Sequence, residues 1–160
     1  MKYHRLTQEQ FHEMHEEFSV FLTTNGIDKV KWDHIKQNNS SSVSTFLDDF
    51  SDLVWEKIIQ KCSYLDFITN DKLFLFHAGK VNVDVIVVKV NSKSCDLLTK
   101  KGFQWMLDNI KTDYVILYRD SKIYEKSRNE FIYSNLLKGA LLSKGIQYEG
   151  LKSYFPNSIK

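Results

Sequence analysis

Two consecutive β-like runs in the middle of the chain constrain the fold most. LFLFHAG at 73–79 and VNVDVIVVKV at 81–90 are rich in β-branched and aromatic residues, and a short link containing glycine joins them. Apolar residues occupy both faces of the second run, with Val83, Val85 and Val87 on one face and Ile86, Val88 and Val90 on the other. The pattern predicts a β-hairpin whose second strand lies inside a sheet.

The N-terminal part of the chain has a helical period instead. Thr7 and Gln10 have the spacing of a capping box, and apolar residues then recur at helical spacing as far as Gly26, which is typical of a helix end. We therefore expect one helix over this stretch.

Two more helices are expected before the hairpin. The first spans about residues 28–37, and the polar stretch NNSSSVS at 38–44 predicts a loop. The second begins with Ser44 or Thr45 as its cap and runs to about Cys62, with apolar residues around most of its circumference.

After the hairpin, the pattern predicts helix, strand and helix. Thr99 caps a helix over 100–111, and DYVILYR at 113–119 is typical of a third strand. A last long helix is predicted from Ser127 to about Lys144, with Gly145 ending it.

These elements predict an α+β fold in a single domain, residues 1–160. We expect a helical part over about 7–67 and a sheet-containing part over about 72–160. The sheet is expected to be small and mixed, with three strands or slightly more around 73–119, and the C-terminal helix is expected to pack on it.

Composition points to an intracellular protein. The two cysteines, Cys62 and Cys95, have no CxxC spacing and suggest reduced thiols rather than a disulfide framework. Neither a signal peptide nor an apolar stretch long enough to span a membrane is visible. We therefore expect a cytoplasmic protein with no membrane partner. The net charge of +2 divides into −3 for residues 1–92 and +5 for 93–160.

The stretch HEMHEEF at 12–18 raises the question of a metal site, because His12 and His15 have a spacing that can bind metal on a helix. The other histidines are isolated, and HEMHEEF differs from HExxH because its histidines are three positions apart. We interpret His12 and His15 as the flank of a helix, and we expect no metal and no cofactor.

The order helix, hairpin, helix, strand resembles the core of restriction-endonuclease-like nucleases, in which an Asp and an acid-x-Lys pair hold magnesium. Here Asp84 and Lys89 are available, but Val87 occupies the position that requires a carboxylate. The resemblance implies topology over roughly 70–118 and does not imply catalysis. A degenerate or unrecognised nuclease-like hydrolase stays as an alternative, although we expect no enzyme.

The segment 114–133 is the best candidate for binding, because it interleaves tyrosines with basic residues. Its candidate binding residues are Tyr118, Arg119, Lys122, Tyr124, Lys126 and Arg128. Three interpretations remain: rings buried in the fold, an interface with a protein or ribonucleoprotein, and direct nucleic-acid binding.

Three segments together, YHRLTQEQFHEMHEEFSVFL, FSDLVWEKIIQKCSYLD and DLLTKKGFQWMLDN, resemble a family of small uncharacterised proteins from Bacteroidota. The resemblance implies a bacterial protein of unknown function and assigns no active-site residue. We expect a non-catalytic protein-interaction module, with a nucleic-acid or ribosome-associated protein as the alternative.

Overall fold

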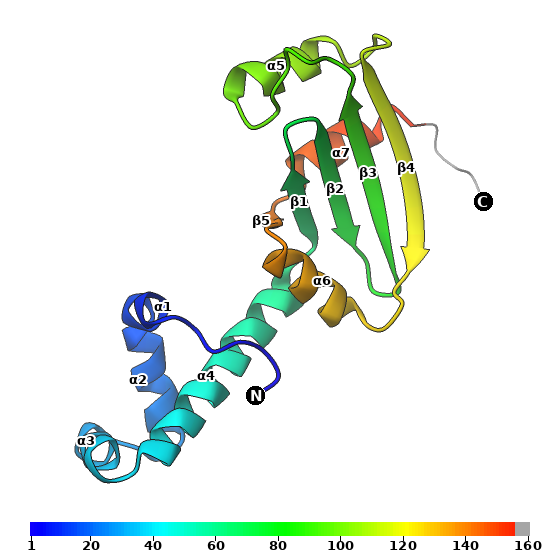
Figure 1. The fold of residues 1–160 in the computed structure, drawn as a ribbon. Coiled ribbons are helices and arrows are strands. Elements are labelled where there is room, and N and C mark those ends of the chain that lie inside the picture. Colours follow the sequence, from blue (N-terminus) through cyan, green and yellow to red (C-terminus); the bar gives the residue numbers. More distant parts are fainter. Residues whose placement is uncertain (156–160) are drawn as a thin grey trace. The chain divides into compact units, whose positions relative to one another are not determined.

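The computed structural model describes residues 1–155, which form two compact units (Figure 1). One unit is Met1–Gln60 and the other begins at Lys61. The first unit is helical, with α1 (Gln8–Glu13), α2 (His15–Thr24), α3 (Lys29–Asn38) and most of α4 (Ser40–Lys61). The second contains every strand of the described chain.

The Thr7 capping box is present, but the predicted first helix is two helices. The hydroxyl of Thr7 accepts from the amide of Gln10 at 3.2 Å, and the side chain of Gln10 accepts from the amide of Thr7 at 2.8 Å. The helical conformation breaks at Met14, whose φ and ψ of −105° and 26° lie outside the α region.

The predicted loop at 38–44 is wrong, because α4 already begins at Ser40. The side chain of Asn39 accepts from the amide of Ser42 at 3.0 Å, so it takes the place of a cap five or six residues before Ser44 or Thr45. A polar composition does not exclude a helix start where an asparagine can satisfy the first free amides.

The core of the helical unit is built around Phe50 of α4, which is 2% exposed. The rings of Phe18 and Phe21 from α2 lie 5.1 and 5.4 Å from it, and Leu6 and Val54 complete the buried cluster. These edge-on and tilted ring contacts hold α2 against α4.

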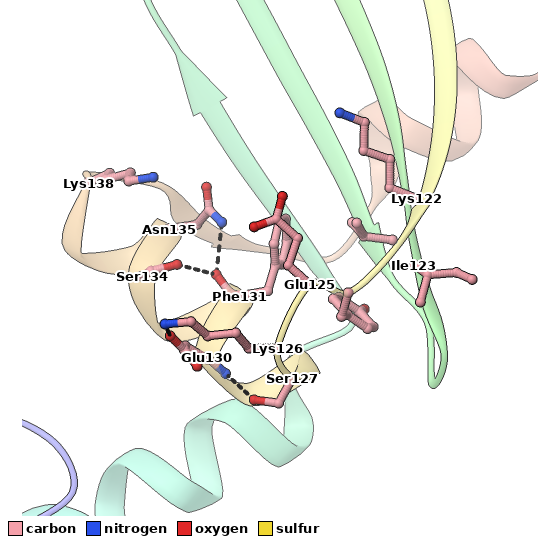
Figure 2. A pocket seen from close by; sticks show the side chains of 12 residues that line it. Lys122, Ile123, Glu125, Lys126, Ser127, Glu130, Phe131, Ser134, Asn135 and Lys138 are labelled. Atoms are coloured by element: carbon pink, nitrogen blue, oxygen red, sulfur yellow. Dashed lines mark hydrogen bonds and ion pairs between the residues drawn. The ribbon is translucent and has the colours of Figure 1, made fainter.

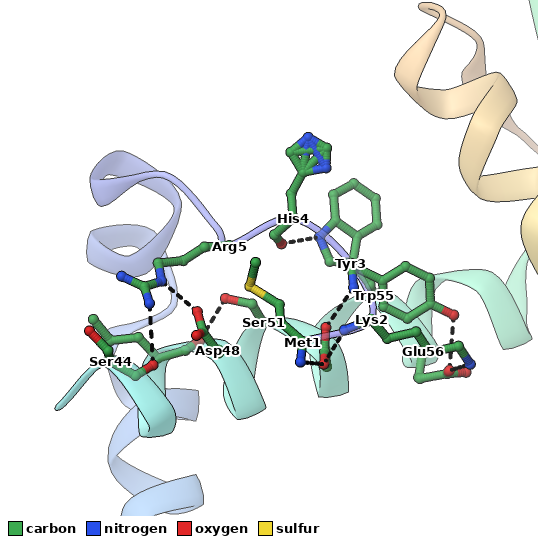
Figure 3. Close-up of polar contacts among 12 residues, drawn as sticks. Met1, Lys2, Tyr3, His4, Arg5, Ser44, Asp48, Ser51, Trp55 and Glu56 are labelled. Carbon is green, nitrogen blue, oxygen red and sulfur yellow. Dashed lines mark hydrogen bonds and ion pairs between the residues drawn. The ribbon is translucent and has the colours of Figure 1, made fainter. Parts of the chain in front are cut away.

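An N-terminal strap, residues 2–6, is tied to one face of α4 (Figure 3). Acids occur every fourth residue on that face, at Asp48, Asp52 and Glu56. Asp52 accepts from the amides of Lys2 and Tyr3 at 2.7 and 2.8 Å. The strap backbone is therefore satisfied by side chains of the helix.

Side chains of the strap add further contacts. The hydroxyl of Tyr3 donates to Glu56 at 2.9 Å, and the ammonium of Lys2 also contacts this carboxylate. Arg5 donates to Asp48 at 2.6 Å. The hydrogen bond from Lys2 is the main cause that lowers the pKa of Glu56, and the hydrogen bond from Arg5 lowers the pKa of Asp48.

The second unit contains a five-stranded sheet in the order β4-β3-β2-β1-β5, in which every pair is antiparallel. The predicted small sheet of three strands or slightly more is therefore roughly right, and the predicted hairpin is confirmed, but the sheet is antiparallel rather than mixed. Its strands are β1 (Tyr64–Ile68), β2 (Lys72–Ala78), β3 (Asn82–Val90), β4 (Val115–Ile123) and β5 (Leu141–Ser143).

The predicted long helix from Ser127 to Lys144 is also wrong. Helix α6 (Arg128–Leu137) ends before Gly139, whose φ of +105° is closed to most other residues. The following residues form β5, which pairs with β1. Pairing with a distant strand therefore determines the conformation where the sequence predicted the last turns of the helix. Gly145 begins α7 (Ile146–Lys152) instead of ending a helix.

Helices cover both faces of the sheet (Figure 1). On one face, α5 (Lys100–Asp108) and α7 pack on β2 and β3, where Met106 and Tyr148 join Leu75, Ile86 and Val88 in the main core. On the other face, α6 covers part of β2 through Phe131, whose ring lies 5.5 Å from Phe76. No helix among the described residues is long and apolar enough to cross a membrane.

Candidate binding cleft

A cleft of about 430 Å³ lies between the end of β4 and α6 (Figure 2). The sheet and the connection after it supply one wall: Val83, Lys122, Ile123, Tyr124, Glu125, Lys126 and Ser127. Helix α6 supplies the other: Glu130, Phe131, Ser134, Asn135 and Lys138. All of these residues belong to the second unit.

The α6 wall follows from helical spacing. Ser127 caps the helix by accepting from the amide of Glu130 at 3.1 Å. Phe131, Ser134 or Asn135, and Lys138 then follow at intervals of three or four residues, which places them on one face. The helical spacing could have identified Ser134, Asn135 and Lys138, which lie beyond the predicted binding segment 114–133.

Aromatic rings position the connection between β4 and α6. The hydroxyl of Tyr124 donates to the carbonyl of Gly79 at 2.8 Å, and its ring lies 5.6 Å from that of Phe131. Burial is the largest cause that raises the pKa of Tyr124, and the charge of Arg128 opposes it. Tyr124 thus fastens one wall of the cleft to the β2–β3 hairpin.

The charges around the cleft are only partly paired. Lys126 donates to Glu130 at 2.7 Å on the exposed surface, and this hydrogen bond raises the pKa of Lys126. Lys122 and Lys138 extend from opposite walls (Figure 2), and neither forms an ion pair within residues 1–155. Glu125 adds one carboxylate to the lining, so the cleft has an excess of cations.

The structure brings together three of the predicted binding residues and separates the other three. Lys122, Tyr124 and Lys126 line the cleft. Tyr118 lies further along the same face of β4 and is 49% exposed. Arg119 lies on the opposite face because neighbouring residues of a strand alternate.

Arg128 points into the fold. Its guanidinium donates to the carbonyl of Ala78 at 3.4 Å and to the carbonyl of Cys62. These two carbonyls stand at the end of β2 and just before β1, so the side chain joins two strand ends. In this arrangement, Arg128 acts on the sheet and not on the cleft.

Arg119 belongs to a polar group on the face of the sheet that α7 covers. Its charge lies close enough to Tyr148 to lower the pKa of that hydroxyl, although burial raises it more. On the same face, the imidazole of His77 lies 3.8 Å from the carboxylate of Asp84, and the ring of Tyr64 stacks on His77 at 4.9 Å.

The two histidines of HEMHEEF lie on either side of the helix break at Met14. Their rings are 6.2 Å apart, and the Nδ1 of His15 lies 3.0 Å from the carbonyl of His12. Within the described residues, no group of three or more histidine, cysteine or acidic side chains could hold a metal ion.

Asp84 and Lys89 do not converge as the nuclease pattern requires. Their odd separation along β3 places them on opposite faces of the sheet. Asp84 faces His77, whereas Lys89 pairs across the sheet with Lys72. No position beside Lys89 on this strand supplies the missing carboxylate, since Val87 is 4% exposed and apolar.

Both cysteines are free, and burial raises the pKa of each thiol. Cys62 lies in the link between α4 and β1 rather than in the helix where the sequence placed it. Its thiol contacts the carbonyl of Tyr64 at 3.6 Å, and Cys95 contacts the carbonyl of Gly102 at 3.3 Å.

A five-stranded antiparallel sheet with helices on both faces and a cleft between β4 and α6, together with a helical unit, defines an α+β protein. The family model of DUF6495, described as a family of unknown function, matches residues 1–156, so the chain belongs to this family. No curated protein and no solved structure matches the chain.

Proposed function

We propose that this chain is a non-catalytic interaction protein whose cleft binds an extended segment of another protein. The segment would carry carboxylates on both sides of an apolar side chain. One observation supports this occupant above others: Lys122 and Lys138 stand on opposite walls without an ion pair in the described chain, and Phe131 adds an aromatic ring to the lining of the same cleft.

The chemistry of the cleft suits such a segment. An apolar side chain that enters the cleft would pack against the side chains of Phe131 and Val83 and leave contact with water. Carboxylates on either side would meet the two lysines, which supply orientation and faster association more than net affinity.

Exposed apolar surface continues from the cleft along β4. Ile116 and Tyr118 lie on the same face of the strand as Lys122 and are 42% and 49% exposed. Tyrosine combines a large apolar ring with a polar end and is enriched at protein interfaces. The bound segment would therefore extend from the cleft towards Tyr118.

Nucleic acid is the alternative ligand that the same lysines and rings would attract. Its binding depends on neutralised phosphates, so it weakens steeply with salt. We favour protein because three lysines and two glutamates line the cleft, and an excess of one cation is small for a ligand whose binding depends on neutralising several phosphates. The two free thiols suit a reducing compartment, and we propose the cytoplasm as the place of action.

Site-specific photocrosslinking in the source cell tests this function. A photoreactive phenylalanine replaces Lys138 in the cleft wall or, as the control, Lys152 on α7. We expect one discrete protein adduct at position 138 that survives nuclease treatment, that is absent at position 152, and that decreases when Lys122→Glu is added. Adducts that vanish with nuclease would support the nucleic-acid alternative, and equal adducts at both positions would refute the cleft.

A further inference from the structure

Strand β4 is an edge of the sheet. It pairs with β3 along all nine of its residues, and no strand of the described chain pairs with its other side. The free N–H and C=O groups of such an edge form a template for another strand. An occupant of this edge therefore has to be an extended chain.

The C-terminal part of this edge is polar and exposed. Asp120, Ser121 and Lys122 are all exposed to solvent. The amide of Ser121 donates to the carboxylate of its neighbour Asp120 at 2.8 Å. A side chain therefore accepts the hydrogen bond that a neighbouring strand would otherwise accept. Neither Asp120 nor Lys122 forms an ion pair with any described residue.

We propose that β4 pairs with β4 of a second copy of this chain, antiparallel and about a two-fold axis that passes through Ser121. Asp120 then faces Lys122 of the partner subunit, and Lys122 faces Asp120 of the partner subunit. The amide of Ser121 exchanges its contact with Asp120 for the backbone of the partner. Two five-stranded sheets join into one continuous sheet.

Charge complementarity selects this register. A two-fold axis makes the residue on it face its own copy, so an axis at Arg119, Asp120 or Lys122 would oppose two like charges. An axis at Leu117 or Tyr118 would place Asp120 opposite Tyr114 or Ile116. Among these five alternatives and Ser121, only Ser121 pairs opposite charges reciprocally.

Within β4, this register leaves one further reciprocal pair besides Asp120 with Lys122. Arg119 faces Ile123 of the partner subunit, and Ile123 is 74% exposed in the single chain. Pairing would cover that apolar side chain with the stem of the arginine. The inference goes beyond the proposed function, because it requires no ligand in the cleft and does not use α6.

Cysteine crosslinking measures the register directly. In a dimer with this axis, the two copies of Ser121→Cys have Cβ atoms about 4.5–5.5 Å apart, within reach of a disulfide after small adjustment. Tyr118→Cys is the matched control on the same strand, because its two copies would lie about 20 Å apart. We expect rapid oxidative dimers for Ser121→Cys and not for Tyr118→Cys. Equal rates for the two variants would overturn the register.

Sedimentation of the full chain tests the association itself. We expect a monomer–dimer equilibrium whose dissociation constant rises about tenfold or more for Lys122→Asp and for Asp120→Lys, since each makes like charges face each other. The double variant Asp120→Lys, Lys122→Asp restores the pairs and should recover the wild-type constant. All positions are exposed, and an unchanged melting temperature shows that the variants fold. A monomer at every concentration, or a dimer insensitive to both reversals, would overturn the proposal. The adduct at position 138 of a chain with Asp120 and Lys122 unchanged tests the proposed function separately.

Discussion

The guanidinium of Arg128 donates to the carbonyl oxygen of Cys62, 66 positions earlier in the chain. A second nitrogen donates to the carbonyl of Ala78. One half-buried side chain from the start of α6 thereby satisfies backbone groups at two strand ends, where ladder hydrogen bonds stop.

Replacing Arg128 should destabilise the protein. In Arg128→Ala, the carbonyls of Cys62 and Ala78 lose a charged donor, and we expect the free energy of unfolding to fall by about 2–3 kcal/mol. Urea unfolding measures it. Lys126→Ala is the matched control, because that lysine makes only an exposed pair with Glu130 and its replacement should leave the free energy of unfolding nearly unchanged. Equal stability for both variants would contradict the structural role of Arg128.

The carboxylate of Asp66 should make stability depend on pH. Its Oδ1 is buried without a hydrogen-bond partner, and burial raises the pKa of Asp66 against a hydrogen bond from Ser143. A raised folded-state pKa gives stability that is complete below the unfolded-state pKa and is lost as the pH rises through the folded-state pKa. Ionised Asp66 therefore weakens the fold at neutral pH.

Asp66→Asn removes this charge. We expect its melting temperature to equal that of the wild type at acid pH and to exceed it at neutral pH. The corresponding gain in the free energy of unfolding should be of the order of 1 kcal/mol at most, because the group is partly solvated. Asp113→Asn, at an exposed position, is the control: the difference between its melting temperature and that of the wild type should not change across the same pH range. A gain that does not change with pH would point to packing rather than ionisation.

The N-terminal strap should depend on Asp52. In Asp52→Ala, the amides of Lys2 and Tyr3 lose their acceptor, and we expect faster hydrogen exchange at these two amides, measured by NMR or mass spectrometry. Asp49→Ala, on the same helix but exposed and not the acceptor of these two amides, should leave the exchange unchanged. Protection that persists in Asp52→Ala would mean that the side-chain contacts of Tyr3 and Arg5 suffice.

Two glycines of one helix should respond in opposite directions to alanine. Gly145 has a φ of +78°, and a Cβ there would lie 2.7 Å from the ring of Tyr64, so Gly145→Ala should cost at least 1–2 kcal/mol by rough estimate. Gly150 lies inside α7 with nothing within 4 Å of an added Cβ, and Gly150→Ala should stabilise by about 0.5–1 kcal/mol. The melting temperatures of Gly145→Ala and Gly150→Ala, each compared with the wild type, measure these two effects. Destabilisation by both would refute the assignment of α7.

Local signals in the sequence predicted the hairpin, the Thr7 and Thr99 caps and the helix of α5. The strands β1 and β5 were missed because YLDFI has no clear alternation and LLS is three residues long. Strand β1 pairs with β2 on one side and with β5 on the other, whereas β5 pairs with β1 alone in the described chain. The contact that forms β5 joins residues 75 to 79 positions apart and leaves no local pattern in the sequence.

The candidate site was predictable only in part, for a similar reason. Lys122, Tyr124 and Lys126 were accessible to a composition argument, since basic and aromatic residues alternate there. The role of Arg128 was not, because its partners are backbone carbonyls that carry no side-chain signature. The α6 wall had a readable helical spacing, but its importance depends on where β4 ends.

The division of the segment 118–128 among the cleft, the far face of the sheet and the strand ends has a practical consequence for mutagenesis. A block replacement of its basic residues would remove the proposed cleft contacts and destabilise the sheet in one step, so loss of a partner from such a variant would carry no information about the contact surface. Single replacements at Lys122 and Arg128, read out separately as association and as stability, keep the two effects apart.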